Sequence, residues 1–270
     1  MLIVNADDWG RSVAETDAAL GCHRRGTLGS VSAMVHMRDS ERAASLARAE
    51  GLDVGLHLNF TQPYDPPDRS PHLEPTQRRL MRFLRTNKFA LLVYHPRLRD
   101  AFREAYDAQI VEFHRLYGQP PSHIDGHHHM HLATNMLLDE VIPRGQRVRR
   151  SFSFWAGEKS LLNRLYRRWV DAHLARRYCI TDYFFALSHC RDEPGATRVF
   201  ALAGTTTVEV MAHPGDDVDF QYLVSEEFQL KCQTIRTGAH ADMECGVHNA
   251  SRRNGQPRGQ GRRVPGTRDT

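Results

Sequence analysis

The sequence predicts a single α/β domain built on a parallel sheet, and two observations carry this prediction. Short apolar runs alternate with amphipathic segments, and strand-then-helix order favours a parallel sheet with right-handed crossovers, open or closed into a barrel. The chain has 270 residues, of which 40% are hydrophobic and 25% are charged, and this composition is typical of a globular domain. In such sheets, binding and catalytic residues lie at the carboxyl ends of strands.

The elements follow in order from the amino terminus. Residues 2–4 are an apolar run that predicts a strand, and Ser12 with Glu15 forms a capping box that begins a helix ending near Gly26. Further strands are predicted at residues 30–36, 53–60, 122–127 and 205–213, and further helices at residues 40–50, 98–117, 135–142 and 158–178. The proline-rich residues 61–80 are predicted to be a loop that covers or builds a site.

The carboxyl-terminal part of the chain differs in charge from the rest. Residues 231–270 contain eight basic and three acidic residues, a net charge of +5, whereas residues 1–230 have a net charge of −1. This segment is rich in Gly and Arg and shows no helical or strand period, so we expect a disordered basic tail. The sequence therefore predicts a folded domain at residues 1–230 and a tail at residues 231–270.

Cysteine usage and hydropathy bear on the compartment. The five cysteines are scattered and include no CxxC pair, so they predict neither a disulfide scaffold nor a thiolate zinc site. No segment approaches the roughly 18 apolar residues of a membrane helix, and the first residues resemble a strand more than a secretory signal. We expect a cytoplasmic protein in a reducing environment.

Histidine is unusually frequent, with 16 in the chain, and several lie where predicted strands end. The side chains at these ends that could carry chemistry are Asp7, Asp8, His57, Asp125, His127, His128, His129, His131 and His213. Carboxylates with neutral imidazoles suit a divalent ion such as zinc, magnesium or manganese, and an Asp-His-His set leaves positions for water and substrate. A metal-bound water loses its proton near neutral pH, and a nearby carboxylate can accept that proton.

Each feature also has an ordinary structural interpretation. Asp7 and Asp8 could form a turn before a helix, His57 could be a satisfied buried histidine, and His213 with its following Pro-Gly could be a turn. The histidine run at residues 127–131 is harder to explain in this way, because so many imidazoles at one strand end would have few hydrogen-bond partners.

The sequence leaves open which histidine of the run is a ligand. His127, His129 and His131 share one face if the strand continues through them, but this parity does not hold if the strand ends at Gly126. His129 and His131 could therefore contact a substrate, support the ligands, or replace His127 among them.

Four short motifs stand in a fixed order along the chain. They are residues 3–10 (IVNADDWG), 55–58 (GLHL), 122–131 (SHIDGHHHMH) and 211–215 (MAHPG). Together they resemble the YdjC-like carbohydrate deacetylases, which include chitooligosaccharide deacetylase, over about residues 1–230. The chain departs from that family at Trp9, where Phe is usual, and at His36, where Asn is usual.

The resemblance implies an irregular TIM-like (β/α) barrel and a hydrolase that removes the N-acetyl group from an amino sugar or oligosaccharide. It implies a divalent metal, with magnesium first and zinc, manganese or cobalt as alternatives. By motif position, Asp7 matches the proton acceptor, and Asp8, His57 and His127 match the metal ligands. His213 falls on the histidine of the late motif, where an acid role is expected.

The family ends with an amphipathic helix and a short apolar strand, and the sequence from Lys231 onward does not resemble them. We hypothesise a reading-frame change or a divergent terminus there. Without that closing element, one edge of the barrel would be exposed.

Other functions and contacts stay open at this point. A metal-dependent phosphoesterase or amidohydrolase on a related barrel, and an inactive barrel scaffold, are the alternatives to a deacetylase. We expect a small N-acetylated sugar as substrate, no membrane and no specific nucleic acid, because the basic tail lacks interleaved aromatic residues; homo-oligomerisation is left open. Trp9, Tyr64 and the pair Arg149-Arg150 are candidates for substrate contact.

Overall fold

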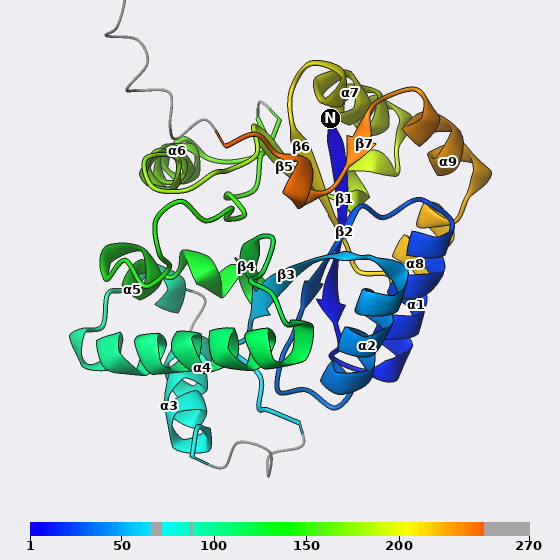
Figure 1. Ribbon diagram of the computed structural model, residues 1–270. Coiled ribbons are helices and arrows are strands. Elements are labelled where there is room, and N and C mark those ends of the chain that lie inside the picture. Colours follow the sequence, from blue (N-terminus) through cyan, green and yellow to red (C-terminus); the bar gives the residue numbers. More distant parts are fainter. Residues whose placement is uncertain (66–71, 87–88, 156, 246–270) are drawn as a thin grey trace, which may run out of the picture.

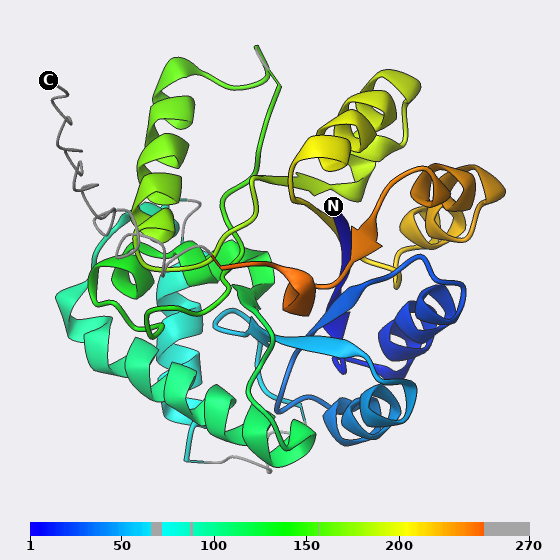
Figure 2. The ribbon, with the colours of Figure 1, turned by 45° about the horizontal axis from the view of Figure 1, so that its top comes forward.

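A parallel sheet that curls into a half-barrel forms the centre of the protein, and helices surround it on the outside (Figures 1 and 2). The computed structural model describes residues 1–65, 72–86, 89–155 and 157–245. The strands in chain order are β1 (Leu2–Trp9), β2 (Ser30–Ala33), β3 (Asp53–Leu58), β4 (Ile124–Gly126), β5 (Tyr183–Ala186), β6 (Val208–Ala212) and β7 (Thr237–Gly238). The predicted α/β fold, a single domain with a curled parallel sheet, is confirmed.

The strand order places the first and the last strand beside each other. The order is β4-β3-β2-β1-β6-β5, and β7 also pairs with β1. On β1, β7 lies against Leu2 and Ile3, whereas β2 pairs farther along from Asn5 to Trp9. Strands β1, β2, β3 and β6 are buried along nearly their whole length, as expected for a parallel sheet covered by helices.

The helices connect these strands in the predicted order. They are α1 (Val13–Arg24), α2 (Ser40–Glu50), α3 (Glu74–Thr86), α4 (Arg99–Tyr117), α5 (Thr134–Leu138), α6 (Leu161–Ala175), α7 (Glu193–Thr205), α8 (Asp217–Leu223) and α9 (Glu226–Gln233). Ser12 caps α1 as predicted, because its side chain accepts a hydrogen bond from the Glu15 amide. Gly51 ends α2 with φ +66°, a left-handed conformation that favours glycine.

Two regions differ from the sequence prediction. Part of the predicted loop at residues 61–80 is helical, since α3 begins at Glu74 and buries Leu80 and Leu84; residues 66–71 lie outside the described residues. Helices α7, α8 and α9 were not predicted, and neither was strand β5, which has only four residues and merges into a short 3-10 helix, η5 (Leu187–Cys190). Short elements of this kind carry too little periodicity to be recognised.

The predicted tail at residues 231–270 is wrong in its first part. Helix α9 continues to Gln233, β7 pairs with β1, and a 3-10 helix, η6 (His240–Asp242), follows. The segment has few apolar residues, but Met243 packs against Ile3 and Cys179, and backbone hydrogen bonds supply the remaining order. This chain therefore has a closing helix and strand; the rest of the predicted tail, residues 246–270, lies outside the described residues.

The cysteine prediction also needs correction. Cys179 and Cys245 form a disulfide, with Cα atoms 5.3 Å apart. No sequence pattern indicates this pair, because the two residues are 66 positions apart and meet only when the carboxyl-terminal segment folds back. Among the described residues, no helix combines the length and the apolar character that crossing a membrane requires.

Candidate metal centre

The register of the sheet brings the predicted site residues to one end of the half-barrel. His57 of β3 lies directly beside Asp125 of β4 in the pairing of these strands. Ala6 of β1 lies beside Ala212 of β6, so the residues that follow them, Asp7 and His213, lie at the same height in the sheet. The carboxyl ends of parallel strands meet at one edge, as the sequence rule requires.

A local irregularity lets two consecutive aspartates face the site. In a regular strand, adjacent side chains point to opposite faces. Here the β1–β2 register shifts between Ala6 and Trp9, and Asp8 has φ +64°, a left-handed conformation that non-glycine residues seldom adopt. Both Asp7 and Asp8 can therefore approach His57. Such strained backbone is found preferentially at functional sites.

Asp8, His57 and His127 form a buried cluster whose ligand atoms lie within 4.8 Å of one another. Asp8 Oδ1 is 3.0 Å from His127 Nδ1 and 3.4 Å from His57 Nε2. Despite these distances, Asp8 Oδ1 and His127 Nε2 have no hydrogen-bond partner among the described residues. Buried polar atoms without partners are costly, so these atoms fit a bound cation that would satisfy them.

The surroundings of His57 favour a positive charge at the cluster. His57 Nδ1 is 2.8 Å from Asp125 Oδ1, which fixes the ring and leaves Nε2 facing Asp8. Burial lowers the pKa of His57, but Asp125 and Asp7 overcome this effect and raise the pKa to about 10. Burial alone would raise the pKa of Asp8, yet His127 and His57 hold it well below its usual range. The donor set therefore fits a divalent cation as well as it fits a proton.

Asp7 lies beside this cluster and is held by an arginine. Both carboxylate oxygens of Asp7 accept hydrogen bonds from Arg149, at 2.8 and 2.7 Å, and Asn5 Nδ2 donates to Oδ1 at 2.9 Å. Asp7 Oδ2 is 3.9 Å from His57 Nε2. Burial raises the pKa of Asp7, but Arg149, followed by His57 and His213, lowers it well below its usual range. Asp7 is thus ionised and fixed in orientation.

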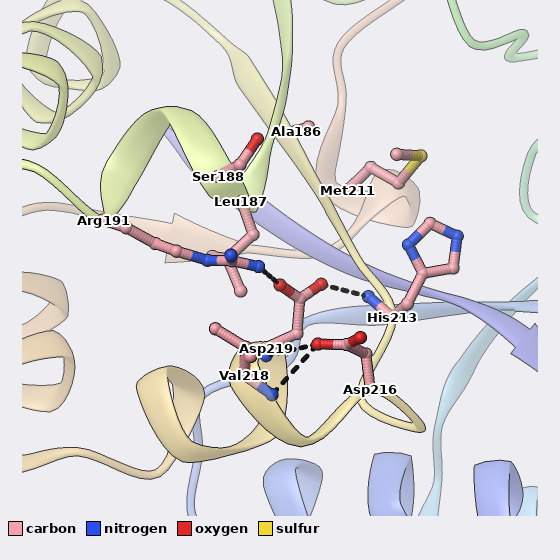
Figure 3. A pocket seen from close by; sticks show the side chains of 9 residues that line it. All are labelled: Ala186, Leu187, Ser188, Arg191, Met211, His213, Asp216, Val218 and Asp219. Atoms are coloured by element: carbon pink, nitrogen blue, oxygen red, sulfur yellow. Dashed lines mark hydrogen bonds and ion pairs between the residues drawn. The ribbon is translucent and has the colours of Figure 1, made fainter.

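His213 leaves β6 on the opposite side of the site from His127. Its amide donates to Asp219 Oδ2 at 2.8 Å, and Asp219 also pairs with Arg191 (Figure 3). The imidazole ring points away from Asp216 and Asp219, as Figure 3 shows. His213 lines a cavity of about 380 Å³, which is open enough for a ligand to reach it.

The histidine run does not continue the strand. Strand β4 ends at Gly126, and residues 127–132 form η4 (His127–Leu132), in which His128 and His129 have positive φ. The strand parity considered from the sequence therefore does not apply. His128 Nδ1 lies 3.0 Å from Thr61 Oγ1, and His131 Nε2 lies 3.0 Å from the Arg149 carbonyl oxygen. Only His127 of the run joins the cluster with Asp8 and His57.

Sequence reasoning misplaced or missed several residues around the site. Arg149, expected to contact substrate, is 2% exposed and pairs with Asp7, Asp125 and Glu209. Trp9 is fully buried in the core, so it does not reach the cavities. Glu209 could have been found from the sequence, because it is a carboxylate in the middle of an apolar strand and such a residue needs a buried partner.

Comparison with known proteins assigns the family. The family model described as YdjC-like protein matches residues 1–250. The chain belongs to the YdjC-like family. The resemblance seen in the four motifs is thereby confirmed, and the match extends past residue 230 to include β7 and η6.

Relatives of this YdjC-like protein carry a common name. The chitooligosaccharide deacetylase of Proteus mirabilis (strain HI4320) is 35% identical over 135 residues, which is 49% of this chain and 50% of the relative. The chain therefore matches only about half the length of that relative and of the Serratia marcescens chitooligosaccharide deacetylase, which is 34% identical over 135 residues, 49% of this chain and 51% of the relative. The Yersinia pestis (strain Pestoides F) chitooligosaccharide deacetylase is 29% identical over 231 residues, 79% of this chain and 81% of the relative.

One solved structure shares the fold of the YdjC-like chain. It is the crystal structure of "a putative cellobiose-phosphate cleavage protein" from Enterococcus faecalis V583. It superposes with a TM-score of 0.57 at 20% sequence identity and covers 88% of this chain and 97% of the other. At this identity the likeness supports the fold alone.

Proposed function

We propose that this protein is a metal-dependent hydrolase that removes the N-acetyl group from an N-acetylated amino sugar. The observation that carries the proposal is the buried Asp8-His57-His127 cluster beside an ionised Asp7; in the described part of the chain, Asp8 Oδ1 and His127 Nε2 have no hydrogen-bond partner. The chitooligosaccharide deacetylase names of the relatives supply the substrate class.

Asp8, His57 and His127 would hold a divalent ion. When bound, such an ion would lower the pKa of a coordinated water and polarise the acetamide carbonyl. The family resemblance favours magnesium, whereas two imidazole ligands also suit zinc, manganese or cobalt. Asp125 would fix the orientation of His57 through its 2.8 Å contact with Nδ1.

Two residues outside the ligand set would move protons. Asp7 lies next to the cluster and would accept the proton of the attacking water, and its hydrogen bonds with Arg149 would keep it oriented. His213 lines the open cavity on the other side and would donate a proton to the departing nitrogen. Acid and base would then act on opposite sides of the scissile amide bond.

Acetate release tests the proposal. We expect N-acetylglucosamine oligosaccharides to release acetate in the presence of Mg²⁺, Mn²⁺, Zn²⁺ or Co²⁺. Asp7→Asn should reduce the rate by about 10²- to 10⁴-fold, the usual contribution of a general base. His127→Ala should lose activity together with bound metal. Asp100→Asn, which changes an exposed aspartate at the start of α4, is the matched control and should retain activity.

Two outcomes would contradict the proposal. Unchanged acetate release in both Asp7→Asn and His127→Ala would show that the cluster is not the site. Metal-dependent hydrolysis of p-nitrophenyl phosphate without acetate release would instead identify a phosphoesterase on the same half-barrel.

A further inference from the structure

A second cavity opens beside the candidate metal centre and differs in character from the cavity at His213. Its volume is about 310 Å³. It lies between the 3-10 helix η2 (Ala90–Leu92), η4 and α6. Its lining includes His128 and His129, which directly follow His127 in η4. The cavity therefore lies next to the cluster, because the ring of its lining residue His128 is 4.0 Å from the His127 ring, centroid to centroid.

The lining of this cavity is mostly apolar. Phe152 packs against His129 with ring centroids 4.6 Å apart, and Leu92 and Leu132 are further lining residues. Two of its polar side chains bond to each other, since Arg167 Nε donates to Asn163 Oδ1 at 2.8 Å.

A third polar side chain of the lining also forms a hydrogen bond within the protein. Ser151 Oγ donates to Asp171 Oδ1 at 2.8 Å. A second sugar ring would bring several hydroxyl groups into the cavity, and each would need a partner or cost about 1–3 kcal/mol on burial. The cavity is better suited to an apolar group than to another sugar.

Two lining residues retain an unused polar atom. Tyr166 Oη and His129 Nδ1 are buried and have no hydrogen-bond partner among the described residues. Together they could serve one or two polar atoms at the start of an otherwise apolar group, such as the oxygen that links a sugar to a chain.

The apolar surface continues outside the cavity along α6. Leu162 is 80% exposed, Leu165 is 50% exposed and Trp169 is 48% exposed. These residues alternate along the helix with the lining residues Asn163 and Tyr166. A chain longer than the cavity would find further apolar contact there.

We propose that this cavity binds an apolar aglycone, so that the substrate is an N-acetylated amino sugar linked to an aliphatic chain. The sugar end of this assignment rests on the proposed function. The aliphatic end rests on the lining of the cavity and on its continuity with His128 and His129.

A series of alkyl glycosides tests the proposal. The substrates are methyl, butyl and octyl N-acetyl-β-D-glucosaminide, used below the concentration at which micelles form. We expect KM to fall along the series and to be at least about tenfold lower for the octyl than for the methyl glycoside. Each methylene that leaves water favours binding by up to about fourfold. Equal KM values for wild-type protein would overturn the proposal.

A matched pair of variants locates the effect. Leu92→Arg places a charge at the cavity, and Leu230→Arg makes the same change at a similarly exposed leucine on α9. The ratio of kcat/KM for the octyl over the methyl glycoside should fall at least fivefold in Leu92→Arg and should be unchanged in Leu230→Arg. Equal loss in both variants would place the octyl preference elsewhere. Circular dichroism checks that both variants are folded.

Direct binding separates this proposal from the proposed function. Octyl β-D-glucoside has no acetamide, so its binding by calorimetry does not depend on deacetylation. If none of the three N-acetyl-β-D-glucosaminides releases acetate, the proposed function fails. The aglycone site is then supported by wild-type binding that Leu92→Arg removes, and it is overturned if wild-type protein does not bind.

Discussion

The half-barrel contains two clusters of one aspartate and two histidines, and they use their polar atoms differently. The upper cluster is Asp8, His57 and His127, and the lower cluster is Asp53, His123 and His240. In the upper cluster, Asp8 Oδ1 lies near two imidazole nitrogens but has no hydrogen-bond partner among the residues that the structure describes.

In the lower cluster the protein satisfies Asp53 and His123, whereas both ring nitrogens of His240 have no hydrogen-bond partner among the described residues. Asp53 Oδ2 accepts hydrogen bonds from Ser30 Oγ at 2.8 Å and from the His240 amide at 3.0 Å. The ring nitrogens of His123 lie 3.0 Å from Ser32 Oγ and 2.9 Å from Ser122 Oγ.

The His123 ring also stacks on His240 with centroids 3.6 Å apart, and His240 Nε2 faces Glu209 Oε2 at 3.5 Å. The two clusters therefore differ most at their aspartates, because Asp8 Oδ1 has no hydrogen-bond partner among the described residues and Asp53 Oδ2 accepts hydrogen bonds from Ser30 and His240. A carboxylate oxygen that already accepts hydrogen bonds from the protein has less need of a cation.

The strongest test of this comparison removes one histidine from each cluster. His127→Ala should lower metal affinity by more than the 10- to 100-fold that loss of a supporting residue costs. His123→Ala should retain metal and lose stability. Metal content after dialysis, measured by mass spectrometry, and urea unfolding distinguish the two. Loss of metal in His123→Ala alone would reverse the assignment.

Arg149 joins the surroundings of the two clusters, so its removal should destabilise the whole half-barrel. Its guanidinium bonds Asp7 near the upper cluster and Glu209 near the lower one. Arg149→Met should lower the free energy of unfolding by about 3–5 kcal/mol, because it leaves buried carboxylates without a cation. Arg168→Met, at an exposed position on α6, is the control in the same urea titration. A loss below about 1 kcal/mol would show that the carboxylates are neutral or hydrated.

The disulfide should support the lower cluster more than the upper one. Cys245 ends the described segment that carries His240, and its bond to Cys179 closes a loop of 66 residues. Cys245→Ser should lower the free energy of unfolding by about 2–4 kcal/mol. Dithiothreitol should produce a similar loss in wild-type protein and no further loss in Cys245→Ser. Metal content should not change in either case.

The smallest expected effect is on the pH dependence of stability. Burial, followed by the charges of His240 and Arg149, holds the pKa of His123 well below its usual range. Below about pH 6.5 the unfolded chain therefore binds a proton that the folded chain does not, and stability falls as the pH is lowered.

Urea unfolding between pH 7.5 and 5 measures this slope. His123→Asn should reduce it by up to about 1.4 kcal/mol per pH unit, the contribution of one titrating group. His129, whose pKa burial and then Arg149 lower to about 3, should still contribute in the variant. An unchanged slope would mean that His123 is protonated in the folded protein.

The sequence correctly predicted the helices and strands that are marked by residues close together in the chain. The helix at residues 40–50 was predicted with its bounds, because Gly51 is a strong helix end and the apolar positions repeat. The four motifs at strand ends located Asp7, Asp8, His57 and His213, because a parallel sheet places such ends together. The carboxyl-terminal strand β7 was missed, since two residues paired with a distant strand leave no pattern in the chain.

The sequence by itself determined the family, the α/β order and the residue types at the strand ends. Only the tertiary structure decided which of those residues meet. Asp8 has a left-handed backbone conformation, and β4 ends at Gly126. As a result His127, and no other histidine of the run, joins Asp8 and His57 in the cluster. The burial of Arg149 and the pairing of Cys179 with Cys245 depend on contacts between segments far apart in the chain. Such contacts are set by strand register and by single-residue bulges, and the period of the sequence does not encode either of these.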